Sequence, residues 1–389
     1  MIPVEILKPA YLFISSATLT VVALHFPTKF HCFFLLPTWL LAAWSLASVT
    51  GNTGLTGVLT GLNSYTAITE LRHSGFVWPS RRSISAACRI WNNPRKLDFR
   101  GRTSPSCAAW SSRLRFALLR GLKAFSIVFV DRWIVQLIRE RLFIDGSILD
   151  FAPDQHHIIR PLVSQLSSVA FDTENLEYNS VTGRQISLRA FMSLSWIWFN
   201  FMTLECYHAI LAVFFVAVLR LDDPDDWPPL FGSLADAWTI RRFWGRFWHR
   251  IATPTFTKWA EIILRVKSRT AIGNAAVAFG VFFLSGLMHA TAAWRTGQRF
   301  ADLDIWFFCA NFLVVAVEIL VSQIYNRVVR RTGLSVHLRP DPWLCVASRT
   351  LGFIWVFTWF FWAVPRWIYP KTLRFLIKEA LIQSENPFL

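Results

Sequence analysis

Two histidines forty residues apart are the first candidates for chemistry in this sequence. His249 ends the aromatic and basic stretch Trp238–His249, and His289 lies in the apolar run 271–294. An ionisable side chain within a bilayer-length segment is costly, so His289 is a functional candidate by default. No Ser or Cys nucleophile motif accompanies it, which favours a general base that takes a proton from a hydroxyl group. The hydroxyl oxygen would then attack an activated carbonyl, for which a thioester is well suited.

The stretch around His249 predicts an amphipathic helix at the membrane surface. At about 100° per residue, its aromatic and basic side chains fall on opposite arcs. The aromatic arc contains Phe243, Trp244, Phe247, Trp248 and Ile251. The basic arc contains Arg242, Arg246, His249 and Arg250. We therefore expect the aromatic face to lie in lipid and the cationic face in water, where it would attract phosphate groups.

The helical face around His289 consists mostly of small residues. Its members are Ala275, Ala278, Phe282, Ser285, Gly286, Ala292 and Ala293. Small residues permit close helix approach, and they also leave space for a substrate beside the imidazole. On the second interpretation, Phe282, Ser285 and Gly286 line a pocket for the acceptor. Ser285 lies one turn before His289, and we expect its hydroxyl to bond back to its own helix rather than act as a nucleophile.

The elements that must position these histidines are membrane helices. Hydrophobic residues make up 54% of the 389 residues, with 20 Trp and 35 Phe. This composition predicts an all-α, polytopic integral membrane protein with about six to eight transmembrane helices and additional interfacial helices. The clear runs are 10–26, 30–49, 191–221, 271–294, 305–325 and 344–364, and the doubtful ones are 50–69 and 118–138. The first two are expected to form a hairpin with Pro27 in its turn.

The sequence indicates a single membrane-embedded domain over residues 1–389, with its motif-bearing core at 237–293. We find no internal repeat and no soluble domain boundary. Residues 72–115 form a basic polar loop, with ten Lys or Arg against Asp98 alone. The formal net charge of +16 is attributed to positive-inside topology and to attraction toward lipid headgroups, not to nucleic acid.

Other polar groups suggest alternatives. The run Asp222–Asp226 fits the DDxxD pattern of magnesium-diphosphate sites, but no second acidic motif accompanies it. The pair His156–His157 lacks the spaced partners of a di-iron cluster, and the six cysteines show no zinc-like spacing. No metal and no cofactor are expected. Glu205, His208 and Glu318 are expected to be interhelical hydrogen-bond partners, although one of them could orient His289.

The motifs Phe243–His249 and Phe283–His289 resemble the membrane-bound O-acyltransferase superfamily, in particular its wax-synthase-like branch. That branch carries an FWGRRWH-like stretch and, some forty residues on, a helix ending SGLxHA. The chain looks like the fungal O-acetyltransferases of terpenoid and meroterpenoid pathways within it. The resemblance implies that His289 is the catalytic base and that His249 helps to place the acyl donor or its carbonyl. Phe247 stands where an Arg is common, which weakens the basic face.

The resemblance further implies an acyl-CoA donor entering from the cytosolic side of the endoplasmic reticulum and an alcohol entering from the bilayer. We therefore predict an O-acetyltransferase that transfers acetyl from acetyl-CoA to a terpenoid-like hydroxyl in secondary metabolism. The residues expected to contact the donor are Arg242, Trp244, Arg246 and Arg250. A wax-ester or sterol-ester synthase using long-chain acyl-CoA remains an alternative. A membrane transporter without catalysis and an intramembrane prenyltransferase are alternatives from other classes.

Overall fold

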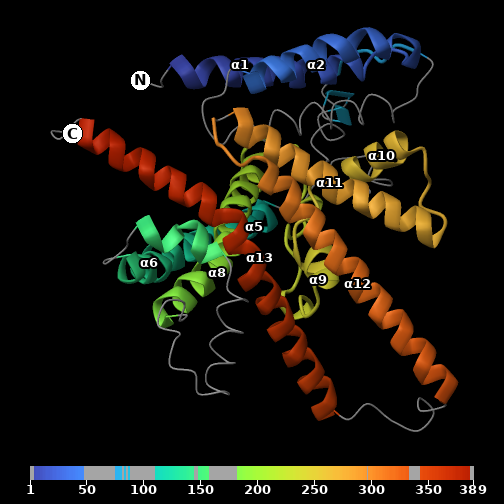
Figure 1. Ribbon diagram of the computed structural model, residues 1–389. Helices are drawn as coiled ribbons and strands as arrows, with labels where there is room; N and C mark the ends of the chain where they lie inside the picture. The colour runs from blue at the N-terminus through green and yellow to red at the C-terminus, as the bar shows by residue number, and fades with distance from the viewer. Residues whose placement is uncertain are drawn as a thin grey trace, which may run out of the picture. The chain divides into compact units, whose positions relative to one another are not determined.

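All regular elements in the described part of the chain are helices (Figure 1). The computed structural model describes residues 4–47, 75–80, 83–84, 86–87, 110–143, 148–156, 182–295, 297–332 and 342–385. The chain divides into two compact units. The first unit comprises Met1–Thr103 and Arg250–Leu320, and the second comprises Ser104–His249 and Val321–Leu389. The predicted all-α class is confirmed.

In the first unit, α1 (Val4–Ala23) and α2 (His31–Ala47) form a hairpin through a short 3-10 turn at Thr28–Phe30 (Figure 1). The buried Ser16 hydroxyl donates to the carbonyl oxygen of Thr38 at 3.0 Å. This bond links the two helices through a buried polar contact. The hairpin predicted from the two closely spaced apolar runs is present.

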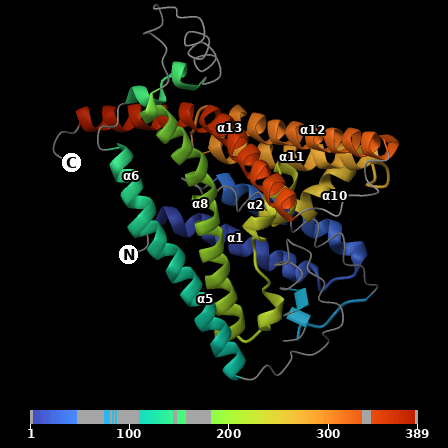
Figure 2. The ribbon, with the colours of Figure 1, turned by 90° about the horizontal axis from the view of Figure 1, so that it is seen from below.

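The remainder of the first unit is built on α11 (Ala271–Arg295), which packs against α10 (Thr253–Leu264) and α12 (Asp302–Thr332). Figure 2 shows α11 lying alongside α12. Glycines on α11 permit both contacts. A Cβ atom on Gly280 would lie 2.5 Å from the Ala260 Cβ atom of α10, and one on Gly286 would lie 2.8 Å from the Ile305 Cα atom of α12. Close approach at small residues is how apolar helices gain dispersion energy without a hydrophobic driving force.

The second unit contains two long helical segments that lie side by side (Figure 2). The first is α5 (Trp110–Val130), which continues through a π turn at Asp131–Val135 into α6 (Gln136–Phe143). The second is α8 (Gly183–Val213), which ends in a π turn at Phe214–Val218. Helix α5 begins at Trp110, so the last six residues of the predicted 72–115 loop are helical. Most of that loop and the doubtful run 50–69 lie outside the described residues.

The long helix α13 (Pro342–Glu385) packs against α8 in the second unit. The Ser193 hydroxyl of α8 donates to the carbonyl oxygen of Phe360 in α13 at 3.2 Å. Further along α13, Tyr369 is buried with Phe151, which lies in one of two 3-10 turns at Ile148–Phe151 and Pro153–His156. The packing of α8 against α13 brings together Trp196 and Phe360, which contact the segment that precedes His249.

Four helices in the described part of the chain are long and apolar enough to cross a membrane. They are Gly183–Val218, Ala271–Arg295, Asp302–Arg331 and Pro342–Ser384. A shorter apolar helix covers Tyr11–Ala23. The polytopic membrane class is therefore confirmed, and the figure of six to eight spans stays a prediction.

Candidate active site

The segment before His249 is not the regular amphipathic helix that the sequence predicts. Helix α9 (Ile240–Arg242) starts at Thr239, whose hydroxyl accepts a bond from the Arg242 N–H at 3.1 Å. A π turn follows at Phe243–Phe247, closed by a bond from the Trp248 N–H to the Phe243 carbonyl at 2.7 Å. Trp248 is extended, so the helix ends before His249. A projection at 100° per residue assumes i→i+4 hydrogen bonds. Because the π turn has i→i+5 bonds, that projection does not predict the side of the segment on which His249 lies.

The aromatic side of this segment is buried in protein and does not face lipid. Phe243, Phe247 and Trp248 are 2%, 5% and 8% exposed. The Phe243 ring lies 4.8 Å from that of Phe360 on α13, and Trp248 lies 5.1 Å from Trp196 on α8, measured between ring centroids. The prediction of an aromatic face in lipid is therefore wrong. Large apolar rings are stabilised by packing in a protein interior as well as by lipid hydrocarbon, so their presence on one face does not distinguish the two environments.

A glycine in the preceding loop allows the chain to pass directly over the π turn. Gly232 donates its N–H to the Phe247 carbonyl at 2.9 Å. A Cβ atom at this position would lie 2.0 Å from the Arg246 carbonyl oxygen, which no side chain could accommodate. The loop can therefore close over the turn only because residue 232 lacks a side chain.

The basic residues of the turn are held to different degrees by one carboxylate. Arg242 donates to Asp236 from Nη2 to Oδ1 at 2.5 Å and from Nε to the backbone oxygen at 2.9 Å. Arg246 approaches the same carboxylate at 3.8 Å, and its side chain is 60% exposed. Arg246 therefore retains donors for an anion, whereas Arg242 is largely committed to Asp236. The donor-contact role stays a prediction for Arg242, Trp244, Arg246 and Arg250.

The His249 imidazole lies half-buried among aromatic rings in the second unit. The Phe231 ring meets it edge-on, with centroids 5.5 Å apart and planes at 82°, and Trp248 lies 5.3 Å away. Phe231 is itself packed edge-on against Phe201 of α8 at 5.0 Å. This aromatic surround restricts the ring orientation, which is what a group that places a substrate requires.

His289 lies half-buried on α11 in the first unit. Its imidazole stacks on the Phe308 ring of α12, with centroids 5.0 Å apart and planes at 19°. The Ser285 hydroxyl donates to the Val281 carbonyl at 2.8 Å, which confirms the expected bond back to its own helix. The orientation of the imidazole therefore depends on how closely α12 approaches α11.

The small-residue face of α11 carries this helix contact. A Cβ atom on Gly286 would meet the Ile305 Cα atom at 2.8 Å and the Phe308 Cβ atom at 3.3 Å. One turn earlier, the Phe282 ring lies 6.2 Å from that of Phe312. Close helix approach, the first of the two interpretations of this face, is therefore observed at Gly286. A pocket for the acceptor formed by Phe282, Ser285 and Gly286 stays a prediction.

The carboxylates of the DDxxD run are used to build the turn after α8. Asp223 pairs with Arg113 of α5 at 3.0 Å. Asp222 accepts a bond from the Trp227 indole at 3.1 Å, and the Asp226 carboxylate accepts the Asp223 N–H at 2.9 Å. These donors occupy three of the four carboxylates, as expected for a structural turn. In the residues that the structure describes, no cluster of three His, Cys, Asp or Glu side chains suits a metal.

Glu205 is confirmed as an interhelical partner. Its side chain is 1% exposed and its Oε2 atom accepts a bond from Lys123 of α5 at 2.8 Å. Neither Lys123 nor Arg113 was predicted as a partner from the sequence. Their spacing could have indicated this role. Arg113, Arg120 and Lys123 are separated by seven and three residues, so they lie on one face of α5. His208 lies beside Trp227, with ring centroids 5.3 Å apart.

Comparison with known proteins identifies the segment that carries both histidines. Residues 227–310 match the model of the membrane bound O-acyl transferase family. The predicted resemblance is confirmed. The matched segment contains the π turn, His249, α10, α11 with His289 and the first turns of α12.

Relatives of the chain are fungal acetyltransferases. Acetyltransferase atnC of Arthrinium sp is 32% identical over 220 residues, which are 54% of this chain and 48% of the relative. Acetyltransferase eriL of Hericium erinaceus is 30% identical over 40% of this chain and 39% of its own length. Acetyltransferase ple2 of Rhodocybe pseudopiperita is 26% identical over 70% of this chain and 71% of its own. The chain thus spans about half or less of the first two relatives. No solved structure matches it.

Proposed function

We propose that the protein is a membrane O-acyltransferase that moves an acetyl group from acetyl-CoA to a hydroxyl group of a hydrophobic, terpenoid-like acceptor. The observation that carries the proposal is the family match over residues 227–310, which encloses both His249 and His289. The fungal acetyltransferases among the relatives support acetyl as the transferred group. A wax-ester or sterol-ester synthase with a long-chain donor is the second candidate within the same class.

In the proposed reaction, His289 is the general base. Its neutral imidazole accepts the proton of the acceptor hydroxyl as that oxygen attacks the thioester carbonyl carbon. A carbon–oxygen bond forms, the carbon–sulfur bond breaks, and the leaving thiolate takes the proton from the imidazolium. The Phe308 ring covers one face of the imidazole. In the proposed site this ring and the apolar side chains of α11 would limit water access and so favour the alcohol over hydrolysis.

His249 is proposed to position the donor or the carbonyl that it carries. Its ring is restrained by Phe231 and Trp248, so a hydrogen bond from it would have a defined direction. Arg246 and Arg250 are the exposed cations nearest to it in the sequence and are proposed phosphate contacts. The acyl-CoA would enter from the cytosolic side of the endoplasmic reticulum, and the acceptor from the bilayer.

The test is acetyl transfer in microsomes that contain the expressed protein, with radiolabelled acetyl-CoA and a panel of terpenoid, sterol and fatty alcohols. His289→Ala should lower transfer by at least about 10²-fold, the usual contribution of a general base. Thr291→Ala is the matched control. It lies on the same helix, and its hydroxyl bonds back to the Leu287 carbonyl at 2.7 Å. Near-normal turnover by a folded His289→Ala variant would refute the mechanism.

The two histidines should also act on one reaction. If they do, His249→Ala and His289→Ala combined should cost much less than the product of the two separate losses, because groups that act as a unit are strongly non-additive. Purely multiplicative losses would contradict a shared transition state.

Fractionation of tagged protein with endoplasmic reticulum markers tests the proposed location.

A further inference from the structure

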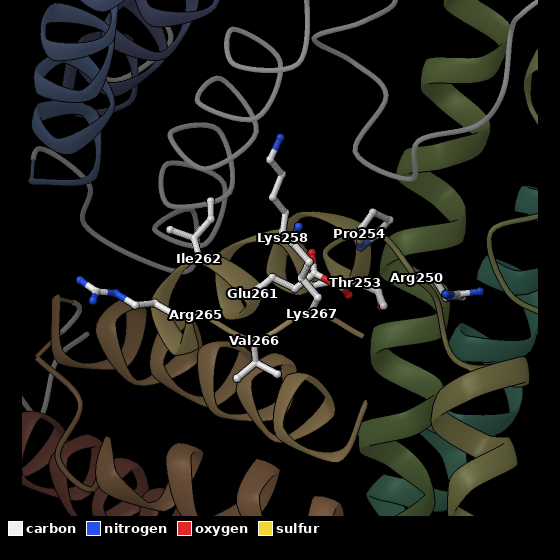
Figure 3. Close-up of a pocket in the computed structure, with 10 residues that line it drawn as sticks. Arg250, Thr253, Pro254, Lys258, Glu261, Ile262, Arg265, Val266 and Lys267 are labelled. Atoms are coloured by element: carbon white, nitrogen blue, oxygen red, sulfur yellow. The ribbon is translucent and has the colours of Figure 1, made fainter. Parts of the chain in front are cut away.

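A groove of about 800 Å³ runs along one face of α10, entirely within the first unit (Figure 3). Arg250 lies at one end, where the chain enters the helix, and Arg265 lies at the other, where the chain leaves it. Figure 3 shows Lys258, Glu261 and Lys267 between these ends. At 1.5 Å per residue, the twelve residues of α10 separate the two cationic ends by about 18 Å.

The opposite face of α10 is committed to packing. Phe256 and Ala260 are almost completely buried, and Ala260 meets Gly280 of α11. Trp259 lies 5.9 Å from Trp39 of α2, measured between ring centroids. Apolar contacts on one side of α10 therefore fix its position. The residues of α10 that line the groove on the other side consequently extend from a fixed backbone.

The loop that follows α10, residues 265–267, also lines the groove and has a well-defined backbone. Arg265 adopts a left-handed backbone conformation with φ at 53°, and the Val266 N–H bonds to the Glu261 carbonyl at 3.2 Å. Gly273 lies against the Lys267 carbonyl, and a Cβ atom there would approach that oxygen to 2.6 Å. The backbone positions from which Arg265 and Lys267 extend are thus determined by the fold and need little ordering on binding.

The charge in the groove is unbalanced. Four cationic side chains and one carboxylate line it. The carboxylate, Glu261, already accepts the Ser268 N–H at 3.4 Å, a bond that holds the loop. Within the described residues, Arg250, Arg265 and Lys267 form no ion pair. These three cations on a fixed surface attract an anion by their summed electrostatic potential.

We propose that this groove binds phosphate groups, supplied either by the nucleotide part of the acyl donor or by the headgroups of anionic lipids. The cations are spread along the helix and not gathered at one point, so the ligand must carry several separated negative charges or several molecules must bind. A nucleotide with phosphates at two positions meets the first condition, and a lipid surface meets the second. The first source rests on the proposed function; the second does not.

The test uses Arg265→Gln/Lys267→Gln, with Arg299→Gln as the control, since Arg299 is an exposed arginine of the same unit outside the groove. Coenzyme A without an acyl group is titrated by calorimetry into purified protein in phosphatidylcholine nanodiscs. Retention of phosphatidylserine is measured by native mass spectrometry after release from mixed nanodiscs. We expect the double variant to weaken one of these two interactions by about 5- to 30-fold, as for the loss of two solvent-exposed ionic contacts. The control should change neither.

The two sources are separated by kinetics. If the groove holds the donor, the double variant should raise the KM for acetyl-CoA and leave turnover of S-acetyl-N-acetylcysteamine, which has no phosphate, unchanged. If the groove holds lipid, the double variant should leave the KM for acetyl-CoA unchanged and lower the retention of phosphatidylserine. Arg265→Lys/Lys267→Arg keeps the charges and should restore binding, which a merely structural defect would not allow.

Unchanged coenzyme A binding together with unchanged phosphatidylserine retention would overturn the proposal, as would a wild-type protein that binds neither. Groove-dependent binding of coenzyme A by a protein that transfers no acetyl group would uphold the groove and overturn the proposed function. The two failures are therefore distinguishable.

Discussion

Gly286 offers a direct way to perturb the site without touching the histidine. Its added Cβ atom would lie 2.8 Å from the Ile305 Cα atom, 3.2 Å from the Asp304 carbonyl oxygen and 3.3 Å from the Phe308 Cβ atom. Two of these are backbone atoms, which cannot swing away as the end of a flexible side chain can. Gly286→Ala must therefore push α12 away from α11 by a few tenths of an ångström.

The magnitude follows from comparison with a glycine in open space. A Cβ atom added to Gly121 on α5 would meet nothing within 4 Å, so Gly121→Ala should gain about 1 kcal/mol of helix propensity. Gly286→Ala gains the same propensity but adds an overpacking cost of about 1–3 kcal/mol. The variants should therefore differ by about that cost, or roughly 1–4 °C in melting temperature for a chain of 389 residues.

Catalysis should respond more strongly than stability. Phe308 carries the stacking contact to His289, so moving α12 displaces the support of the imidazole. A misplacement near 1 Å can cost about 10²-fold in rate, and the smaller shift expected here should cost roughly 3- to 30-fold in kcat. Thermal unfolding in detergent and acetyl transfer at saturating donor measure the two effects. If the Gly286→Ala variant has the same melting temperature as the Gly121→Ala variant and keeps full kcat, the packing argument is incorrect.

Three further predictions concern the polar groups. Ser285→Ala should keep kcat within about threefold and change at most the KM for the acceptor, because the hydroxyl bonds to its own helix; loss of all turnover would indicate a nucleophile. EDTA should leave transfer unchanged while Arg113→Ala lowers the melting temperature, since Asp223 is held by that arginine; metal-dependent transfer would reverse this assignment. Lys123→Met should destabilise the protein by about 1–3 kcal/mol, discounted because the lysine is 41% exposed, and adding Glu205→Gln should recover part of the loss; strictly additive losses in denaturant titrations would show that the pair is uncoupled.

The sequence alone was sufficient for the membrane class of the protein, whereas the roles of its candidate residues stay predictions. Runs of apolar residues near bilayer length predict membrane helices because each span must satisfy its own backbone. A lone His289 in such a run and the aromatic-basic stretch before His249 were enough to suggest acyl transfer. The bond of Ser285 to its own helix also followed from residue type and position.

The tertiary structure decided which partners these residues have. Amphipathicity identifies an apolar face, but lipid and protein interior are both apolar, so only the packing of Phe243 and Trp248 against α8 and α13 shows which one covers it. The π turn that ends the helix before His249 contains Phe243, one of the residues that make these contacts. Likewise, the pairing of Arg242 with Asp236 and the stacking of His289 on Phe308 join residues whose proximity no helical periodicity encodes.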